Sequence, residues 1–334
     1  MTFRQLLLVG TVIGFWTAKA QDPIFTQSNY IQETINPAFS GFEDNDRIGA
    51  GLLSRVQWPN LDLQINTQYA FVNRSYEYSP SLAFGVGVNA VWQYESFNNY
   101  NYAQVNFNYA HRINLNNGWY FRPALEVGVG NKSNRFRNLT LADQININSG
   151  FINPVSVDPF VDRVNTRFFM DINAGFIIEK EESSNGIAYW LGGAVRHLNR
   201  PNISIVEGER LPLDIFYSFH GNFRFPFLLD NSIMMTTNLM VQGPYNRLDV
   251  GAIFQLRAIL LGLTAATNPA RNDGNEHLVT SVNALVGFEY DTFRFGFSYD
   301  KNTSNIGRTD GVYELSVTYL SRCRRCNTDR SRKR

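Results

Sequence analysis

Apolar and polar residues alternate with a period of two along most of this chain of 334 residues. In residues 313–319, aromatic and aliphatic side chains occupy every odd position, and residues 61–71 and 293–299 repeat the pattern. This is the period of a β-strand with one apolar and one polar face. The runs are about nine to thirteen residues long, which suits a tilted strand crossing an outer membrane. The sequence therefore predicts an all-β protein, a single transmembrane antiparallel β-barrel.

A scan for such runs predicts about fourteen strands, an even number as in bacterial single-chain barrels. They lie between residues 46 and 321 and begin near Arg47, Leu61, Ser81, Asn101, Gly118, Arg167, Ile187, Leu213, Ser232, Leu248, Ile259, His277, Thr292 and Val312. Tight turns are expected at residues 116–118, near Ala258 and at residues 289–292. The polar gap at residues 131–165 is too long for a simple connector. We expect it to be a functional loop or one that covers the pore.

A soluble β-sandwich is the competing architecture, because its strands also alternate apolar and polar positions. The polar face of a sandwich meets bulk water, for which Lys and Glu are well suited. Here that face carries mostly Asn, Gln, Gly, Ser and Arg, and the chain holds 26 Phe and 16 Tyr. A lipid-facing wall with a polar lumen and aromatic belts accounts for this composition better than a sandwich does.

The first residues have the features of an export signal. Arg4 precedes an apolar run from Leu6 to Trp16, and Ala18-Lys19-Ala20 forms an A-x-A cleavage site. The alternative is a membrane anchor, but the run is shorter than the roughly 20 residues of a spanning helix. We therefore predict that residues 1–20 are a signal peptide that is removed. No later segment has about 18 uninterrupted apolar residues, which excludes a helical membrane protein.

The chain is predicted to end in a short basic tail, residues 322–334, with seven basic residues and one acidic residue. Such a run either binds an acidic partner or a phospholipid surface, or is simply solvated. Because the strand number is even, the tail and the N-terminal segment are expected on the same, periplasmic side. Cys323 and Cys326 are the two cysteines of the chain. A structural zinc site needs four ligands, so a local or interchain disulfide is the remaining interpretation.

The histidines do not indicate catalysis. His111, His197, His220 and His277 are scattered, and none has a His, Ser or Asp neighbour at a spacing that specifies a nucleophilic or acid–base site. His220 falls on the polar face of its strand beside Ser218, where a hydrogen-bonding role in the lumen is expected. We predict a protein that is not an enzyme, with no catalytic residue, no cofactor, no metal and no nucleic-acid partner.

Residues 21–45 are predicted to be an irregular periplasmic segment before the first strand. Pro37 fixes φ and lacks an N–H donor, and Gly41 permits conformations closed to other residues. This turn chemistry suits a plug or cap, and equally a plain lead-in to the barrel. Trp58 beside Pro59 suits an interfacial anchor where a strand leaves the membrane, because indole is amphipathic and Pro ends strand pairing.

Several short motifs resemble those of the PorP/SprF family of Bacteroidota outer-membrane proteins. The order and spacing of these motifs cover essentially the whole mature chain. The matching segments are residues 21–27 (QDPIFTQ), 36–41 (NPAFSG), 55–59 (RVQWP), 190–201 (WLGGAVRHLNRP), 298–300 (SYD) and 311–319 (GVYELSVTY). The residues expected to carry family-specific structure or partner binding are Asn36, Pro37, Ala38, Gly41, Arg55, Gln57, Trp58, Pro59, His197, Leu198 and Pro201.

This resemblance implies a non-enzymatic outer-membrane barrel of the type IX secretion and gliding machinery. Its expected partner is a large secreted adhesin or another type IX substrate that carries a C-terminal sorting domain of type B. Some family members associate instead with the periplasmic ring or peptidoglycan-binding components, and all contact outer-membrane lipid. A general porin or solute channel is the alternative function, and an outer-membrane hydrolase is a third.

Overall fold

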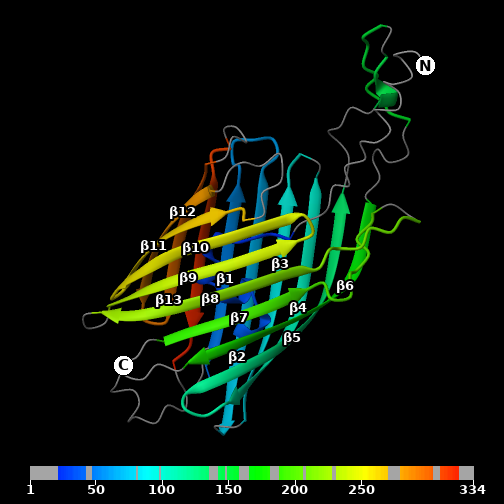
Figure 1. The fold of residues 1–334 in the computed structure, drawn as a ribbon. Helices are drawn as coiled ribbons and strands as arrows, with labels where there is room; N and C mark the ends of the chain where they lie inside the picture. Colours follow the sequence, from blue (N-terminus) through cyan, green and yellow to red (C-terminus); the bar gives the residue numbers. More distant parts are fainter. Residues whose placement is uncertain are drawn as a thin grey trace, which may run out of the picture.

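The computed structural model shows a closed antiparallel β-barrel in which each strand pairs with its neighbours in sequence (Figure 1). It describes residues 22–42, 47–79, 82–97, 99–134, 142–146, 149–157, 165–180, 188–205, 208–227, 231–269, 279–303 and 309–322. The last strand closes the barrel on the first, with Leu320 opposite Gly49 and Val312 opposite Gln57. Closure leaves no free edge along this seam.

The barrel has fourteen strands, as predicted. They are β1 (Ile48–Gln57), β2 (Ile65–Ser79), β3 (Leu82–Glu95), β4 (Tyr100–Asn114), β5 (Trp119–Asn134), β6 (Asn165–Lys180), β7 (Ala188–Arg196), β8 (Phe216–Phe227), β9 (Asn231–Gln242), β10 (Tyr245–Leu256), β11 (Ile259–Thr267), β12 (Val279–Tyr290), β13 (Phe293–Asn302) and β14 (Val312–Leu320). The largest shift from the predicted starts is in β2. The alternation begins at Leu61, but residues 59–63 form turns after Pro59.

The two ends of the barrel differ, and we name them by their connections. Tight turns join β4 to β5, β10 to β11 and β12 to β13 at one end, here called the turn end. Asn116, Asn117 and Gly118 all have positive φ, which explains the Asn-Asn-Gly sequence of the first of these turns. The long connections β5–β6 and β7–β8 lie at the opposite end, here called the loop end.

The wall has the two faces that the alternation predicts. Along β4, Gln104, Asn106 and Asn108 are buried, whereas Val105 and Phe107 between them are exposed on the outside. The outer face thus supplies the apolar surface that lipid requires, and the inner face is polar. Among the described residues, no helix is both long enough and apolar enough to span a membrane.

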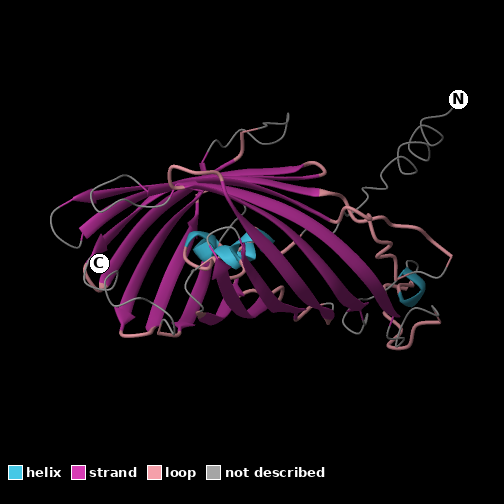
Figure 2. Cartoon of the chain, turned by 90° about the horizontal axis from the view of Figure 1, so that it is seen from below, coloured by secondary structure: helices cyan, strands magenta, loops and turns pink. Residues whose placement is uncertain are grey.

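The N-terminal segment, residues 22–42, lies inside the barrel (Figure 2). We call it the plug. It contains three short 3-10 helices, η1 (Thr26–Asn29), η2 (Gln32–Thr34) and η3 (Pro37–Phe39). Ile31 and Phe39 of the plug are almost completely buried, in apolar clusters with wall residues such as Leu53 and Ile177. Of the two arrangements left open above, the structure has the plug and not the lead-in.

The plug runs through the lumen from the loop end to the turn end. Asp22 bonds to Gln242, the last residue of β9 before its turn at the loop end. At the other extreme, Gly41 packs on Gly85 near the start of β3. The described chain therefore begins at the loop end and finishes, after β14, at the turn end. The plug thus threads the barrel. The tail beyond Arg322 lies outside the described residues, and its expected place on the periplasmic side stays a prediction.

The predicted long loop is shorter than expected and does not cover the pore in the part described. Residues up to Asn134 belong to β5, and the described residues 142–146 and 149–157 are mostly exposed. They hold a 3-10 helix, η4 (Ala142–Gln144), and a bridge between Ile145 and Ile152. Figure 1 shows this part extending past the strand ends. The lumen is instead covered from the β7–β8 loop, whose Ile203 and Leu213 pack on Tyr102 and Phe169.

Candidate functional site

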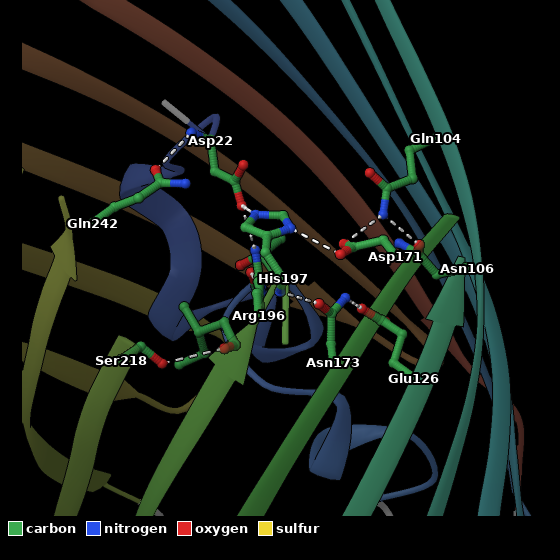
Figure 3. A network of polar contacts seen from close by, with 12 residues as sticks. Asp22, Gln104, Asn106, Glu126, Asp171, Asn173, Arg196, His197, Ser218 and Gln242 are labelled. Atoms are coloured by element: carbon green, nitrogen blue, oxygen red, sulfur yellow. Dashed lines mark hydrogen bonds and ion pairs between the residues drawn. The ribbon is translucent and has the colours of Figure 1, made fainter. Parts of the chain in front are cut away.

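Four anchors hold the plug to the wall, and the one at the loop end is ionic (Figure 3). His197, just past the end of β7, lies between two carboxylates. Its Nε2 is 2.8 Å from Asp22 Oδ2 of the plug, and its Nδ1 is 2.9 Å from Asp171 Oδ1 of β6. Carboxylates accept but do not donate, so both ring nitrogens donate and the imidazole is positively charged. The backbone N–H of Asp22 also donates to Gln242 Oε1, at 3.0 Å.

His197 is held in position by its own backbone. It has φ 61°, an uncommon conformation for a non-glycine residue, and its N–H donates to Asn173 Oδ1 at 2.8 Å. Asn173 in turn donates to the buried Glu126, at 2.7 Å. The neighbouring Arg196 donates to the carbonyl oxygen of Thr34 in the plug. The network thus links β5, β6 and the end of β7 to the plug.

Charge explains the protonation of this anchor. Burial alone lowers the pKa of His197, but Asp22 and Asp171 outweigh it and raise that pKa to about 9. Burial raises the pKa of Asp22, but His197 and Arg196 hold it well below its ordinary value. The stabilisation from His197 is complete below its unfolded pKa of about 6.5 and is lost as pH rises through about 9. The stabilisation from Asp22 is lost only in strong acid.

We therefore expect the barrel to unfold at lower temperature as pH rises from about 7 to 10. The measurement is the midpoint of heat-modifiable gel migration at each pH, for the wild type and for His197→Gln. The variant keeps a hydrogen-bonding side chain but has no proton to lose in this range. Its midpoint should change less with pH, and equal slopes for the two proteins would contradict the assignment of the charge to His197.

The second anchor joins the plug to the closing strands. Glu314 of β14 is almost completely buried, and its two carboxylate oxygens accept from the backbone N–H groups of Thr26 and Gln27, each at 2.8 Å. Arg55 of β1 lies 2.6 Å from the same carboxylate and neutralises it. The Gln27 side chain donates to Ser298 of β13 at 3.1 Å. One acidic side chain thus ties β1 and β14 to η1.

The third anchor is Asn36, which is completely buried. Its Oδ1 accepts from the N–H of Ala38 at 2.9 Å and so caps η3, while Pro37 occupies the first turn, where no donor is needed. Its Nδ2 donates to the carbonyl oxygens of Phe176 and Gly193, at 3.0 and 3.2 Å. His220 Nε2 is also 3.0 Å away. His220 thus has the hydrogen-bonding role in the lumen that its strand position predicts.

The fourth anchor, at the turn end, is a close approach of two backbones. Gly41 has φ +67°, and a Cβ on it would lie 2.7 Å from the Cα of Gly85 in β3. A Cβ on Gly85 would lie 1.9 Å from the carbonyl oxygen of Ser40. Both positions therefore require glycine. Arg122 of β5, paired with Glu179 at 2.9 Å, donates to the carbonyl oxygens of Gly41 and Phe42.

These contacts show where the sequence-predicted residues lie. Those brought together in plug–wall contacts are Asn36, Pro37, Ala38, Gly41, Arg55 and His197. The others lie near the loop end. Gln57 accepts from Arg55, and Trp58 has φ 56° with its N–H donating to Gly311. Pro59 begins the β1–β2 turns, Leu198 is exposed, and Pro201 is buried in the β7–β8 loop.

Sequence reasoning missed the acidic partners of these residues. Asp171 and Glu126 were not selected, and Asp22 and Glu314 were noted only as parts of motifs. A signal was present, because each wall carboxylate interrupts the inner face of a strand where Asn, Gln and Ser otherwise prevail. A buried carboxylate needs a charged or hydrogen-bonding partner. For Glu314, the plug provides such partners through the N–H groups of Thr26 and Gln27.

A small cavity remains between the plug and the wall at the loop end. Its volume is about 50 Å³, room for a few waters, and its lining includes Asp22, Glu33, Tyr69, Glu126 and Arg196. In the described part of the chain, no group of three or more His, Cys, Asp or Glu is arranged to hold a metal ion.

The comparisons with known proteins agree with the motifs. A family model described as type IX secretion system membrane protein PorP/SprF matches residues 17–319. The chain belongs to this family. No curated protein matches its sequence. The protein is thus an outer-membrane β-barrel of a secretion-related family. On the plug side, the anchor residues Asp22, Thr26, Gln27, Asn36 and Gly41 lie within the segments that resemble PorP/SprF motifs.

Solved structures resemble the PorP/SprF barrel only distantly. The translocator domain of the autotransporter NalP from Neisseria meningitidis is 11% identical, with a TM-score of 0.44 over 89% of this chain and 95% of that one. The KdgM porin is 8% identical, with a TM-score of 0.37 over 81% and 98%. A mutant of the TodX monoaromatic hydrocarbon channel is 9% identical, with a TM-score of 0.44 over 85% and 91%.

The signal peptide predicted at residues 1–20, Cys323, Cys326 and most of the basic tail lie outside the described residues. Predictions about their removal, pairing or binding stay predictions.

Proposed function

We propose that this barrel is a closed docking platform, which binds a secreted type IX substrate through its C-terminal sorting domain and holds it at the cell surface. The observation that carries the proposal is the plug. It runs through the lumen and is fixed to the wall at both ends, by Asp22–His197 and by Gly41–Gly85. A lumen closed in this way supports work at a surface rather than passage through a pore, which also disfavours the porin alternative.

The loop end is the surface that a secreted partner would reach. In outer-membrane barrels short turns face the periplasm and longer loops face the outside. The described part of the β5–β6 loop presents exposed apolar side chains, namely Phe151, Ile152, Val155 and Val157. A group of exposed apolar side chains on one loop is typical of an interaction site. The turn end would then face periplasmic components of the secretion machinery.

The test uses the purified barrel in detergent and the purified sorting domain of a type IX substrate encoded in the same genome. We expect saturable binding, and a loss of about tenfold in affinity for the double variant Phe151→Asp, Val155→Asp. The matched control is the double variant Leu61→Asp, Leu63→Asp, which places the same charges at two exposed apolar residues of the β1–β2 turns. The proposal is wrong if no sorting domain binds the wild-type barrel while the heat-modifiable shift shows that it is folded.

A further inference from the structure

Strand β6 extends past its neighbour at the loop end. It pairs with β5 along its whole length, from Trp119 opposite Lys180 to Asn134 opposite Asn165. It pairs with β7 only between Ala174 and Lys180. Among the described residues, the stretch from residue 165 to residue 173 therefore has a strand partner on one side alone, and Figure 1 shows β6 continuing beyond the end of β7. We call this stretch the β6 overhang.

The overhang directs backbone groups toward the open side. In an antiparallel pair, alternate residues point their N–H and C=O to opposite neighbours. The N–H and C=O of Ile172 bond to Asn199 and Leu198, and the C=O of Met170 also bonds to Asn199. Even-numbered residues thus face the open side. Three residues on this side keep backbone groups without a backbone partner in the part of the chain that the structure describes. These groups are the N–H and C=O of Thr166 and Phe168 and the N–H of Met170.

The part of the open side beyond these loop contacts is accessible. Phe168 and Met170 are 76% and 57% exposed on the outer face, and Thr166 and Arg167 are exposed as well. The β7–β8 loop covers the open side only through Leu198 and Asn199, at Ile172 and at the C=O of Met170. Its Asn202 carbonyl oxygen accepts from the Arg167 side chain, and Ile203 and Leu213 fold inward onto Phe169. Natural proteins usually protect such an edge with proline, a bulge or outward lysines, and residues 165–173 contain none of these.

We infer that the β6 overhang binds an extended strand of the secreted partner, which adds to the sheet beside Thr166, Phe168 and Met170. This inference rests on the proposed function, and it identifies the β6 overhang as the part of the barrel that the secreted partner contacts. A row of backbone donors and acceptors at ladder spacing recognises an extended strand and little else. The partner strand would place apolar side chains over Phe168 and Met170, and its register would be set by their alternation.

Geometry disfavours a second copy of the barrel as the occupant. Strands of outer-membrane barrels tilt by about 40° from the barrel axis. Two copies in one membrane, related by a two-fold axis along the membrane normal, would present β6 overhangs that cross at about twice that angle. Crossed strands cannot form a ladder of hydrogen bonds. A strand on a secreted partner is not held in the membrane and can align with β6.

The test compares Phe168→Pro with Phe168→Leu. Proline removes the N–H that faces the open side, whereas the N–H groups bonded to β5 come from odd-numbered residues and remain. Leucine keeps the N–H and an apolar side chain. We expect Phe168→Pro to bind the sorting domain about tenfold more weakly than the wild type, and Phe168→Leu to bind within about twofold of it. Heat-modifiable migration shows whether each variant is folded.

Hydrogen exchange of the wild-type barrel gives a second readout that needs no variant. Strand addition should slow amide exchange at Thr166, Phe168 and Met170 when the sorting domain binds. If the domain binds but exchange there is unchanged and Phe168→Pro binds normally, strand addition is wrong and the docking function stands. If the domain does not bind the wild-type barrel at all, both proposals fail. Protection that appears without the sorting domain and depends on barrel concentration would assign the edge to a second copy.

Discussion

Barrels with Gly85→Val are expected to conduct ions across a planar bilayer, whereas the wild-type barrel carries little current. A Cβ at this position would overlap the carbonyl oxygen of Ser40, at 1.9 Å, and the Cα of Gly41, at 2.9 Å. Both are backbone atoms, so the plug itself must move. The carbonyl oxygens of Gly41 and Phe42 would then leave Arg122. We expect the turn end of the lumen to open and the current to rise at least about tenfold, because a fourteen-stranded barrel is nearly as wide as a porin.

The matched control is Gly221→Val, on the outer face of β8. A Cβ there would meet the side-chain tip of Leu191, at 2.6 Å, which can turn away into lipid. This variant adds the same side chain to a strand glycine but leaves the plug in place, so its current should equal that of the wild type. A wild-type barrel that already conducts steadily would contradict a closed lumen and favour the porin alternative. Equal, low currents for both variants would show that the turn-end contact does not seal the barrel.

The barrel wall could be predicted from the sequence because its determinants are local. Alternation along each strand sets which face meets lipid, and the Asn-Asn-Gly turn at residues 116–118 can be identified from three adjacent residues. Strand number and order followed from counting such segments. Boundaries were less certain where a turn interrupts the alternation, as at Pro59 before β2.

The sequence could not decide between a plug and a plain lead-in, because the determinants of the plug are distant in sequence. Residues 22–42 have no two-residue period, and their partners are 175 positions away for Asp22 and His197 and 287 for Gln27 and Glu314. Glycine at 41 and 85 is meaningful only once the two backbones are known to touch. The β6 overhang likewise depends on where β7 stops pairing, and nothing in β6 itself indicates that point.

Replacing Glu314 by Ala is expected to destabilise the barrel by about 3–5 kcal/mol, the cost of breaking a buried ion pair by removing one partner. The substitution leaves Arg55 as a buried charge and the N–H groups of Thr26 and Gln27 without their acceptor. The midpoint of heat-modifiable migration should fall by several degrees. The loop half of the plug should also loosen, which would make residues near Thr26 accessible to protease added outside.

Two variants separate the ion pair from a general effect of losing a charge. Asp291→Ala removes a carboxylate from the exposed pair with Arg322, whose side chains are 53% and 80% exposed, so its midpoint should change little. Arg55→Met combined with Glu314→Met removes both buried charges, and we expect it to be more stable than Glu314→Ala because no unpaired charge remains. A Glu314→Ala midpoint equal to that of Asp291→Ala would mean that the residues flanking η1, Phe25 and Tyr30, hold it through their apolar cluster with Leu53 and Tyr69. The carboxylate would then only fix its register.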